Sequence, residues 1–291
     1  MINKNCFLLF IDPYHPLNGN IYYHLDYFNF VSKFDKDVKF VFYLEPNHFY
    51  WLNKEIILEI AKERFDQVNF NPENIFFEQT KNFNLLKYRS KNIVTTDHTY
   101  FKLDGLIPGE NIFIFNTWFS LKYKYLIRNK FCTILNESPE NGEINYIRKI
   151  DLSGLKESQN NPNNLFVYIS GERSIVEEKL EDIYNKYSTY FDFVLTCQNY
   201  NLNIRKEKLK QFMYRLPNCF EQFSTYLYIP PRQLDFAPRL IIESKFLNKN
   251  ILIDSFPENE NGMKRINSVL NNDINEYILN QTDFVIEKLC V

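Results

Sequence analysis

Short apolar runs alternate along this chain with longer stretches whose apolar residues recur at helical spacing. In the first half, the apolar runs predict strands at residues 6–11, 38–44, 75–77, 92–96, 112–115 and 131–135. The longer amphipathic stretches predict one helix that ends near Phe34 and another over residues 49–65. Such alternation is typical of βαβ units, which build mainly parallel sheets.

The alternation is interrupted once and then resumes. Residues 136–164 are rich in Asn, Ser, Pro and Gly, which favour turns and bury little, so we place a domain boundary near residue 150. Beyond it we predict strands at 165–170, 191–196, 226–229 and 250–253, and helices over 174–187, over 238–247 and from 262 onward. The pattern predicts an α/β fold of two Rossmann-like domains, residues 1–150 and 151–291, which face each other across a cleft.

Composition excludes several classes of protein. With 45% hydrophobic residues in 291 positions the chain is not intrinsically disordered, and a net charge of −2 gives no global positive field for nucleic acid. The five cysteines are odd in number and lack a CxxC pair, which argues against a disulfide framework or a zinc site. No apolar run is long enough for a signal peptide or a membrane span, so we expect a cytoplasmic protein. One basic cluster fits a solvated helix face and leaves open a peripheral contact with the inner membrane face: Lys122, Lys124, Arg128 and Lys130.

The stretch 226–245 carries the strongest functional signal. A predicted strand ends in two prolines, a short loop carries Asp235, and a helix begins at Pro238 with Arg239 beside it and Glu243 in its second turn. Ligands of parallel sheets bind outside the carboxyl ends of the strands, where this loop lies. The stretch resembles the C-terminal signature of retaining glycosyltransferases of the GT-B architecture, especially family 4, with the resemblance extending over residues 165–255.

The resemblance implies a role for each of these residues. Glu243 would accept hydrogen bonds from the two vicinal hydroxyls of a ribose, and the helix N-terminus would lie beside the diphosphate. Asp235 would hold hydroxyls of the transferred sugar, although the family usually has Glu there and glycines in place of Phe236 and Ala237. The alternative is that Glu243 forms only a surface ion pair with Arg239, one helical turn back.

Two further segments of the second half fit a donor site. Gly171 follows a predicted strand and allows close approach of a phosphate, and Arg173 matches a basic residue that neutralises the diphosphate in the resembling family. Arg215 lies in a segment where such enzymes commonly pack the base against backbone, and an ordinary buried strand and turn is the other interpretation.

The first half offers candidate residues for the acceptor side. His15, Asn18 and Gly19 lie in the loop after the first predicted strand, where these enzymes carry a loop near acceptor and phosphates. Asp97 and His98 end another strand and are the candidate catalytic residues, because either could contact the sugar or deprotonate an acceptor hydroxyl. A structural cap at a strand end is the alternative for this pair.

These residues lead to a functional hypothesis. We predict a glycosyltransferase that moves a sugar from a nucleoside diphosphate sugar to an acceptor hydroxyl, with retention and with neither metal nor cofactor. The acceptor is either a surface glycan or a hydroxylated base of phage DNA. Two alternatives stay open: a non-catalytic binding or scaffold protein with the GT-B fold, and a nucleotide-sugar epimerase with His98 as its acid or base. The sequence does not indicate an oligomeric state.

Overall fold

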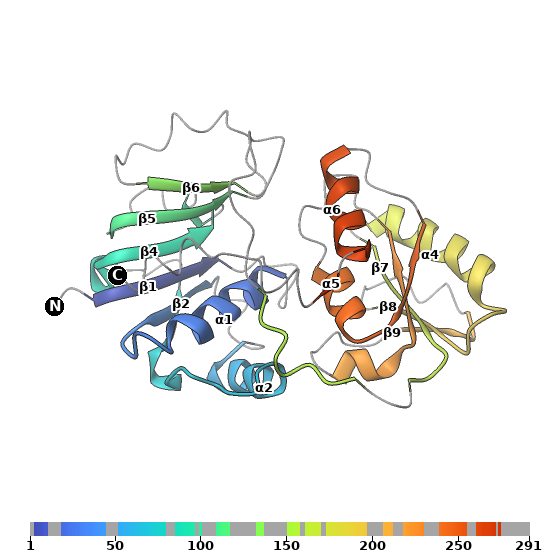
Figure 1. Cartoon of the computed structure of the whole chain (residues 1–291), viewed down its shortest axis with the longest axis horizontal. Helices are drawn as coiled ribbons and strands as arrows, with labels where there is room; N and C mark the ends of the chain where they lie inside the picture. The colour runs from blue at the N-terminus through green and yellow to red at the C-terminus, as the bar shows by residue number, and fades with distance from the viewer. Residues whose placement is uncertain are drawn as a thin grey trace. The chain divides into compact units, whose positions relative to one another are not determined.

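The chain forms two compact units in a computed structural model, and each is described by itself (Figure 1). Unit 1 comprises Met1–Asp151 with Asn280–Val291, and unit 2 comprises Leu152–Leu279. The structure describes residues 3–10, 19–44, 52–79, 85–96, 99–100, 109–116, 132–136, 150–157, 161–169, 173–196, 206–211, 218–229, 239–254, 260–271 and 273–274.

Unit 1 is built on a six-stranded parallel sheet of order β3-β2-β1-β4-β5-β6. Its strands are β1 (Asn3–Phe10), β2 (Lys39–Leu44), β3 (Ile75–Gln79), β4 (Ser90–Thr96), β5 (Gly109–Asn116) and β6 (Cys132–Asn136). This is the doubly wound strand order of Rossmann folds, in which the direction of winding reverses between the first and fourth strands. The switch point of unit 1 therefore lies between β1 and β4.

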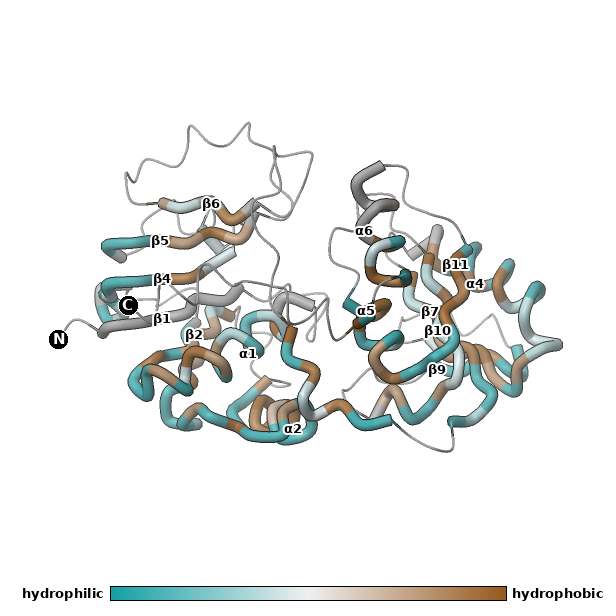
Figure 2. Tube along the Cα trace, in the orientation of Figure 1, coloured by the Kyte–Doolittle hydropathy of each residue, from teal (hydrophilic) through white to brown (hydrophobic). Residues whose placement is uncertain are grey.

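Strands β4 and β5 are polar where they begin and apolar at their centres, as their colours show in Figure 2. Helices α1 (Gly19–Val31) and α2 (Lys54–Arg64) connect the first strands, and the short 3-10 helices are η2 (Pro72–Asn74) and η4 (Leu85–Tyr88). Asn53 caps α2, because its side chain accepts a hydrogen bond of 2.9 Å from the backbone N–H of Ile56.

Unit 2 is built on a five-stranded parallel sheet of order β11-β10-β7-β8-β9. Its strands are β7 (Leu165–Tyr168), β8 (Val194–Thr196), β9 (Leu209–Gln211), β10 (Thr225–Tyr228) and β11 (Asn250–Ile253). Its helices are α4 (Arg173–Tyr187), η7 (Asn218–Gln222), α5 (Arg239–Phe246) and α6 (Glu260–Asn271). Winding reverses between β7 and β10, which makes this pair the switch point of unit 2.

The helices of unit 2 cover both faces of its sheet (Figure 1). Val176 and Leu180 of α4 pack in one buried cluster with Val167 of β7 and Leu227 of β10. Helix α5 contacts β10, β11 and α6. Because crossovers that leave a parallel sheet in opposite directions place their helices on opposite faces, α4 and α5 lie on opposite sides of the sheet.

The α/β fold of Rossmann-like units predicted from the sequence is confirmed. Every predicted strand is present, with ends shifted by a few residues, and the predicted strand over 191–196 is shortened to β8. Strand β9 was missed because it has three residues, of which only Leu209 is buried. The cleft between the domains and the boundary near residue 150 stay predictions.

Candidate functional site

The switch point of unit 2 brings together two strand ends that are distant in sequence. Strands β7 and β10 pair in parallel, with Tyr168 opposite Tyr228 at their carboxyl ends. Helix α4 begins at Arg173 soon after β7, and α5 begins at Arg239 after β10. The topology therefore places the beginnings of α4 and α5 after adjacent strand ends, the position where open α/β sheets bind ligands.

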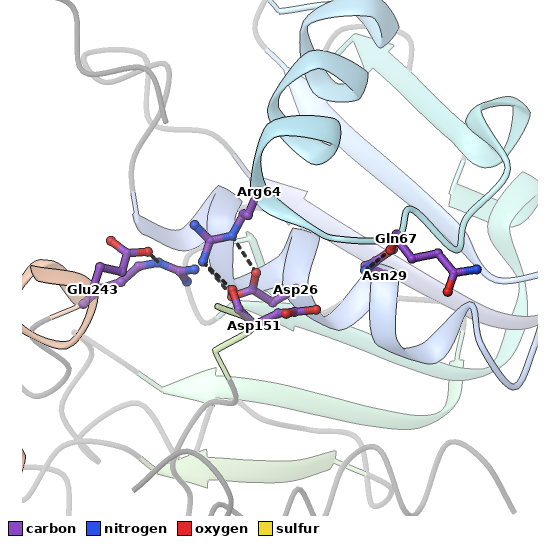
Figure 3. Close-up of polar contacts among 7 residues, drawn as sticks. Asp26, Asn29, Arg64, Gln67, Asp151 and Glu243 are labelled. Atoms are coloured by element: carbon purple, nitrogen blue, oxygen red, sulfur yellow. Dashed lines mark hydrogen bonds and ion pairs between the residues drawn. The ribbon is translucent and has the colours of Figure 1, made fainter. Parts of the chain in front are cut away.

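A buried ion pair occupies the first turns of α5. The guanidinium Nε of Arg239 donates to Oε1 of Glu243 across 2.7 Å, the contact marked by the dashed line at Glu243 in Figure 3. Arg239 is 7% exposed and Glu243 is completely buried. The ion pair that the sequence allowed as an alternative is thus present, but its expected surface location is wrong, because both side chains are buried.

This pair is electrostatically unusual. Breaking a buried ion pair by removing one partner costs about 3–5 kcal/mol, because the remaining charge stays out of water. Arg239 is also the first residue of α5, where the helix dipole disfavours a cation by about 0.3–1 kcal/mol. The guanidinium is therefore held at the start of α5 by an anion, and in this structure Glu243 is one such anion.

Two sets of hydrogen bonds that were not predicted from the sequence fix the C-terminal end of α5. Asn248 has a left-handed backbone (φ 53°), and the N–H groups of Asn248 and Lys249 bond the carbonyls of Lys245 and Ser244, which is a Schellman cap. The ammonium of Lys245 donates to the carbonyls of Val269 and Leu270 in the last turn of α6, each across 2.6 Å. These contacts hold the helix that carries Arg239 and Glu243.

A buried lysine lies at the opposite, amino end of the same sheet. Lys249 directly precedes β11, and its Nζ donates to the Asn161 side chain and, across 3.0 Å, to the carbonyl of Phe223, the residue shortly before β10. Burial lowers the pKa of Lys249 to about 8. Because this position is remote from the carboxyl ends of the strands, we assign Lys249 a structural role.

The lowered pKa of Lys249 predicts a pH dependence of stability. In the unfolded chain the pKa returns toward 10.5, so between pH 8 and 10.5 the unfolded state binds more protons. The free energy of unfolding should therefore rise with pH across this window, because deprotonation relieves the cost of the buried charge. Urea titrations at stepwise pH values check this as the difference between the wild type and Lys249→Met. Equal pH profiles for the two proteins would contradict it.

Two hydrogen-bonded threonines lie at the carboxyl end of β4, one of the two strands at the switch point of unit 1. Strands β1 and β4 pair with Phe7 opposite Val94, and β4 ends at Thr96. The Oγ1 of Thr96 accepts a 3.2 Å hydrogen bond from the backbone N–H of Thr99 and lies 3.0 Å from the hydroxyl of Thr99. Both threonines are buried. The hydrogen bonds thus join Thr96 to Thr99. The two residues between these threonines in sequence are the predicted catalytic Asp97 and His98.

Unit 1 also contains a buried charged network that sequence reasoning missed (Figure 3). Arg64, the last residue of α2, is fully buried and donates through Nε to Oδ1 of Asp26 in α1 across 2.8 Å. Its Nη2 donates to the carbonyl of Asp151 across 3.2 Å. Asp26 and Arg64 each lie among apolar residues of amphipathic stretches, so only their meeting in space distinguishes them from ordinary surface charges.

The predicted site residues divide into two groups. Those within the described residues are Gly19, the first residue of α1, Arg173, the first residue of α4, and the pair Arg239 and Glu243. The basic cluster over 122–130 lies outside the described residues. The other predicted site residues lie outside them too, namely His15, Asn18, Asp97, His98, Gly171, Arg215, Asp235 and Pro238. Of the predicted residues that are described, the structure brings Arg239 and Glu243 into contact.

Two other features are absent from the described part of the chain. No group of three or more His, Cys, Asp or Glu residues there could hold a metal ion. No described helix combines the length and apolarity that crossing a bilayer requires.

Comparison with known proteins identifies the fold. No family model and no curated protein matches the sequence. The crystal structure of HepE from Anabaena in complex with UDP and glucose matches with a TM-score of 0.57 and 8% identity, over 99% of this chain and 97% of that chain. A protein described as a UDP-N-acetylglucosamine 2-epimerase from Listeria monocytogenes follows, with a TM-score of 0.49, 9% identity and coverage of 96% and 91%. MurG from Acinetobacter baumannii has a TM-score of 0.44, 7% identity and coverage of 99% and 94%.

The likeness to HepE, with a TM-score above 0.5, is a likeness of fold. The GT-B fold predicted from the sequence is confirmed by this likeness, which extends over nearly the whole of both chains. Membership of family 4 stays a prediction.

Proposed function

We propose that this protein is a glycosyltransferase whose nucleoside diphosphate sugar binds at the switch point of unit 2. The observation that carries the proposal is the placement of Glu243 on α5, the helix that follows β10 beside β7. Carboxylates at that place suit the vicinal hydroxyls of a ribose, since each oxygen accepts hydrogen bonds. The GT-B fold shared with HepE, which was crystallised with UDP and glucose, supports the same interpretation.

The remaining roles follow from the sequence and are part of the proposal. Gly171 and Arg173 would lie against the diphosphate at the beginning of α4, and the first turn of α5 would present free N–H groups to it. Arg215 would lie near the base, Asp235 near the transferred sugar and Pro238 at the start of the helix. In unit 1 we assign Asp97 and His98 to catalysis, and His15, Asn18 and Gly19 to the acceptor or phosphate loop.

The chemistry of transfer would rest on positioning and electrostatic support of the departing diphosphate. We propose retention of the anomeric configuration without metal or cofactor, and an acceptor hydroxyl on a surface glycan or on a hydroxylated base of phage DNA. A cytoplasmic location, with peripheral contact at the inner membrane face, completes the proposal.

Nucleotide binding tests the donor site directly. We expect one of UDP, ADP, GDP, CDP or TDP to bind the wild type, and Glu243→Gln to weaken that nucleotide at least about tenfold. Glutamine keeps the size of the side chain but loses the charge-assisted hydrogen bonds, which are worth about 1.5–3 kcal/mol each. Isothermal titration calorimetry measures both affinities.

The matched control is Glu178→Gln, an exposed glutamate on α4, which should leave the affinity unchanged. A wild type that binds none of the five nucleotides would remove the basis of the donor site. Binding that is equally strong in Glu243→Gln would place the nucleotide elsewhere.

A non-catalytic binding or scaffold protein is the second candidate, and a specific observation favours it. The carboxylate of Glu243 is completely buried and already accepts a hydrogen bond from Arg239, as a purely structural residue would. Release of free nucleoside diphosphate from a bound sugar donor separates the two candidates, because only the enzyme turns its donor over. The epimerase alternative stays a prediction of the sequence.

A further inference from the structure

The ion pair on α5 raises a question about access to the proposed donor site. Glu243 has no exposed surface, and the partner seen on its Oε1 is Arg239, which is itself nearly buried. A ribose can hydrogen-bond this carboxylate only if a group that covers it moves. Arg239 lies one helical turn nearer the helix N-terminus, between Glu243 and the end at which the diphosphate would bind.

The charge of Arg239 limits how such a movement can happen. A guanidinium taken from its buried carboxylate needs another anion, because a buried charge without compensation is costly. The start of a helix is also the place where a cation is disfavoured and a phosphate is favoured. A diphosphate at the start of α5 would therefore supply the anion that Arg239 needs when Glu243 turns to the ribose.

We infer that Arg239 is a specificity-determining latch that exchanges partners when the donor binds. This inference rests on the proposed function. Without donor, the guanidinium holds Glu243; with donor, it pairs with the diphosphate, and Glu243 accepts the ribose hydroxyls. A nucleoside without phosphates offers Arg239 no replacement anion, so the latch opposes its binding. The ratio of the affinities for nucleoside diphosphate and nucleoside is thus larger than the direct contacts to the phosphates alone would give.

The test compares UDP with uridine, or ADP with adenosine if ADP is the nucleotide that binds. We expect the wild type to prefer the diphosphate by about a hundredfold to a few thousandfold, since losing a compensating buried charge interaction changes affinity by that much. In Arg239→Met the diphosphate should bind at least about tenfold more weakly, because its charged partner is gone. The nucleoside should bind more tightly, because Glu243 no longer has to leave Arg239 to accept the ribose hydroxyls.

The gain for the nucleoside distinguishes a latch from a plain phosphate ligand. Arg239→Gln serves as a second variant, because its neutral amide still donates a hydrogen bond to Glu243 and disturbs folding less. Lys156→Met, which removes an exposed positive charge of unit 2, should change neither affinity. Circular dichroism establishes that each variant is folded before titration.

Each result decides the inference. Weaker diphosphate binding together with tighter nucleoside binding supports the latch. A diphosphate that weakens while the nucleoside stays unchanged overturns it and leaves Arg239 as a phosphate ligand only. Unchanged affinities for both ligands overturn it while the proposed function stands. A wild type that binds no nucleotide would overturn the proposed function itself.

Discussion

Asp26→Ala is expected to lower the free energy of unfolding of unit 1 by about 3–5 kcal/mol, because it leaves the guanidinium of Arg64 buried without its carboxylate. Both members of the pair are nearly inaccessible, and they join α1 to the end of α2. Tryptophan fluorescence in a urea titration measures the effect, because both tryptophans, Trp51 and Trp118, belong to unit 1.

An exposed aspartate of the same unit provides the control. Asp37→Ala should change the free energy of unfolding by less than about 0.5 kcal/mol, as expected of a surface substitution. The double variant Asp26→Leu with Arg64→Met should recover only part of the loss, because the Asp151 carbonyl still loses its donor. An Asp26→Ala protein as stable as the wild type would show that the network contributes little.

The second large effect concerns the pair on α5. Glu243→Ala should destabilise unit 2 by about 3–5 kcal/mol, since Arg239 is 7% exposed and loses a carboxylate at 2.7 Å. Far-UV circular dichroism in urea measures this loss. The Glu243→Ala substitution should shift the urea transition seen by tryptophan fluorescence in unit 1 less than Asp26→Ala does. Glu178→Ala, at an exposed site of α4, is the matched control.

Replacing both partners separates the cost of an isolated charge from the value of the pair. The double variant Arg239→Met with Glu243→Leu should regain most of the stability, because apolar side chains of similar size replace a buried ion pair at little or no cost. If the double variant is as unstable as Glu243→Ala, the pair itself contributes to the fold. Because both lack the carboxylate of Glu243, neither Glu243→Ala nor the double variant should bind a nucleotide at the proposed site.

The two buried pairs differ in how far the sequence could predict them. Arg239 and Glu243 are four residues apart on one helix, so their contact was open to prediction from spacing alone. Their burial was not, because it depends on how the face of α5 packs. Asp26 and Arg64 belong to different helices, and no local pattern links them.

The sequence by itself determined the α/β class, the positions of the strands and the polar break before unit 2. These follow from the spacing of apolar residues, which is a local property of each element. Strand order, and with it the switch points between β1 and β4 and between β7 and β10, was decided only by the tertiary structure. The physical reason is that pairing and burial depend on parts of the chain distant in sequence. The spacing of Glu243 and Arg239 could thus predict their ion pair, but only the tertiary structure shows that both side chains are buried.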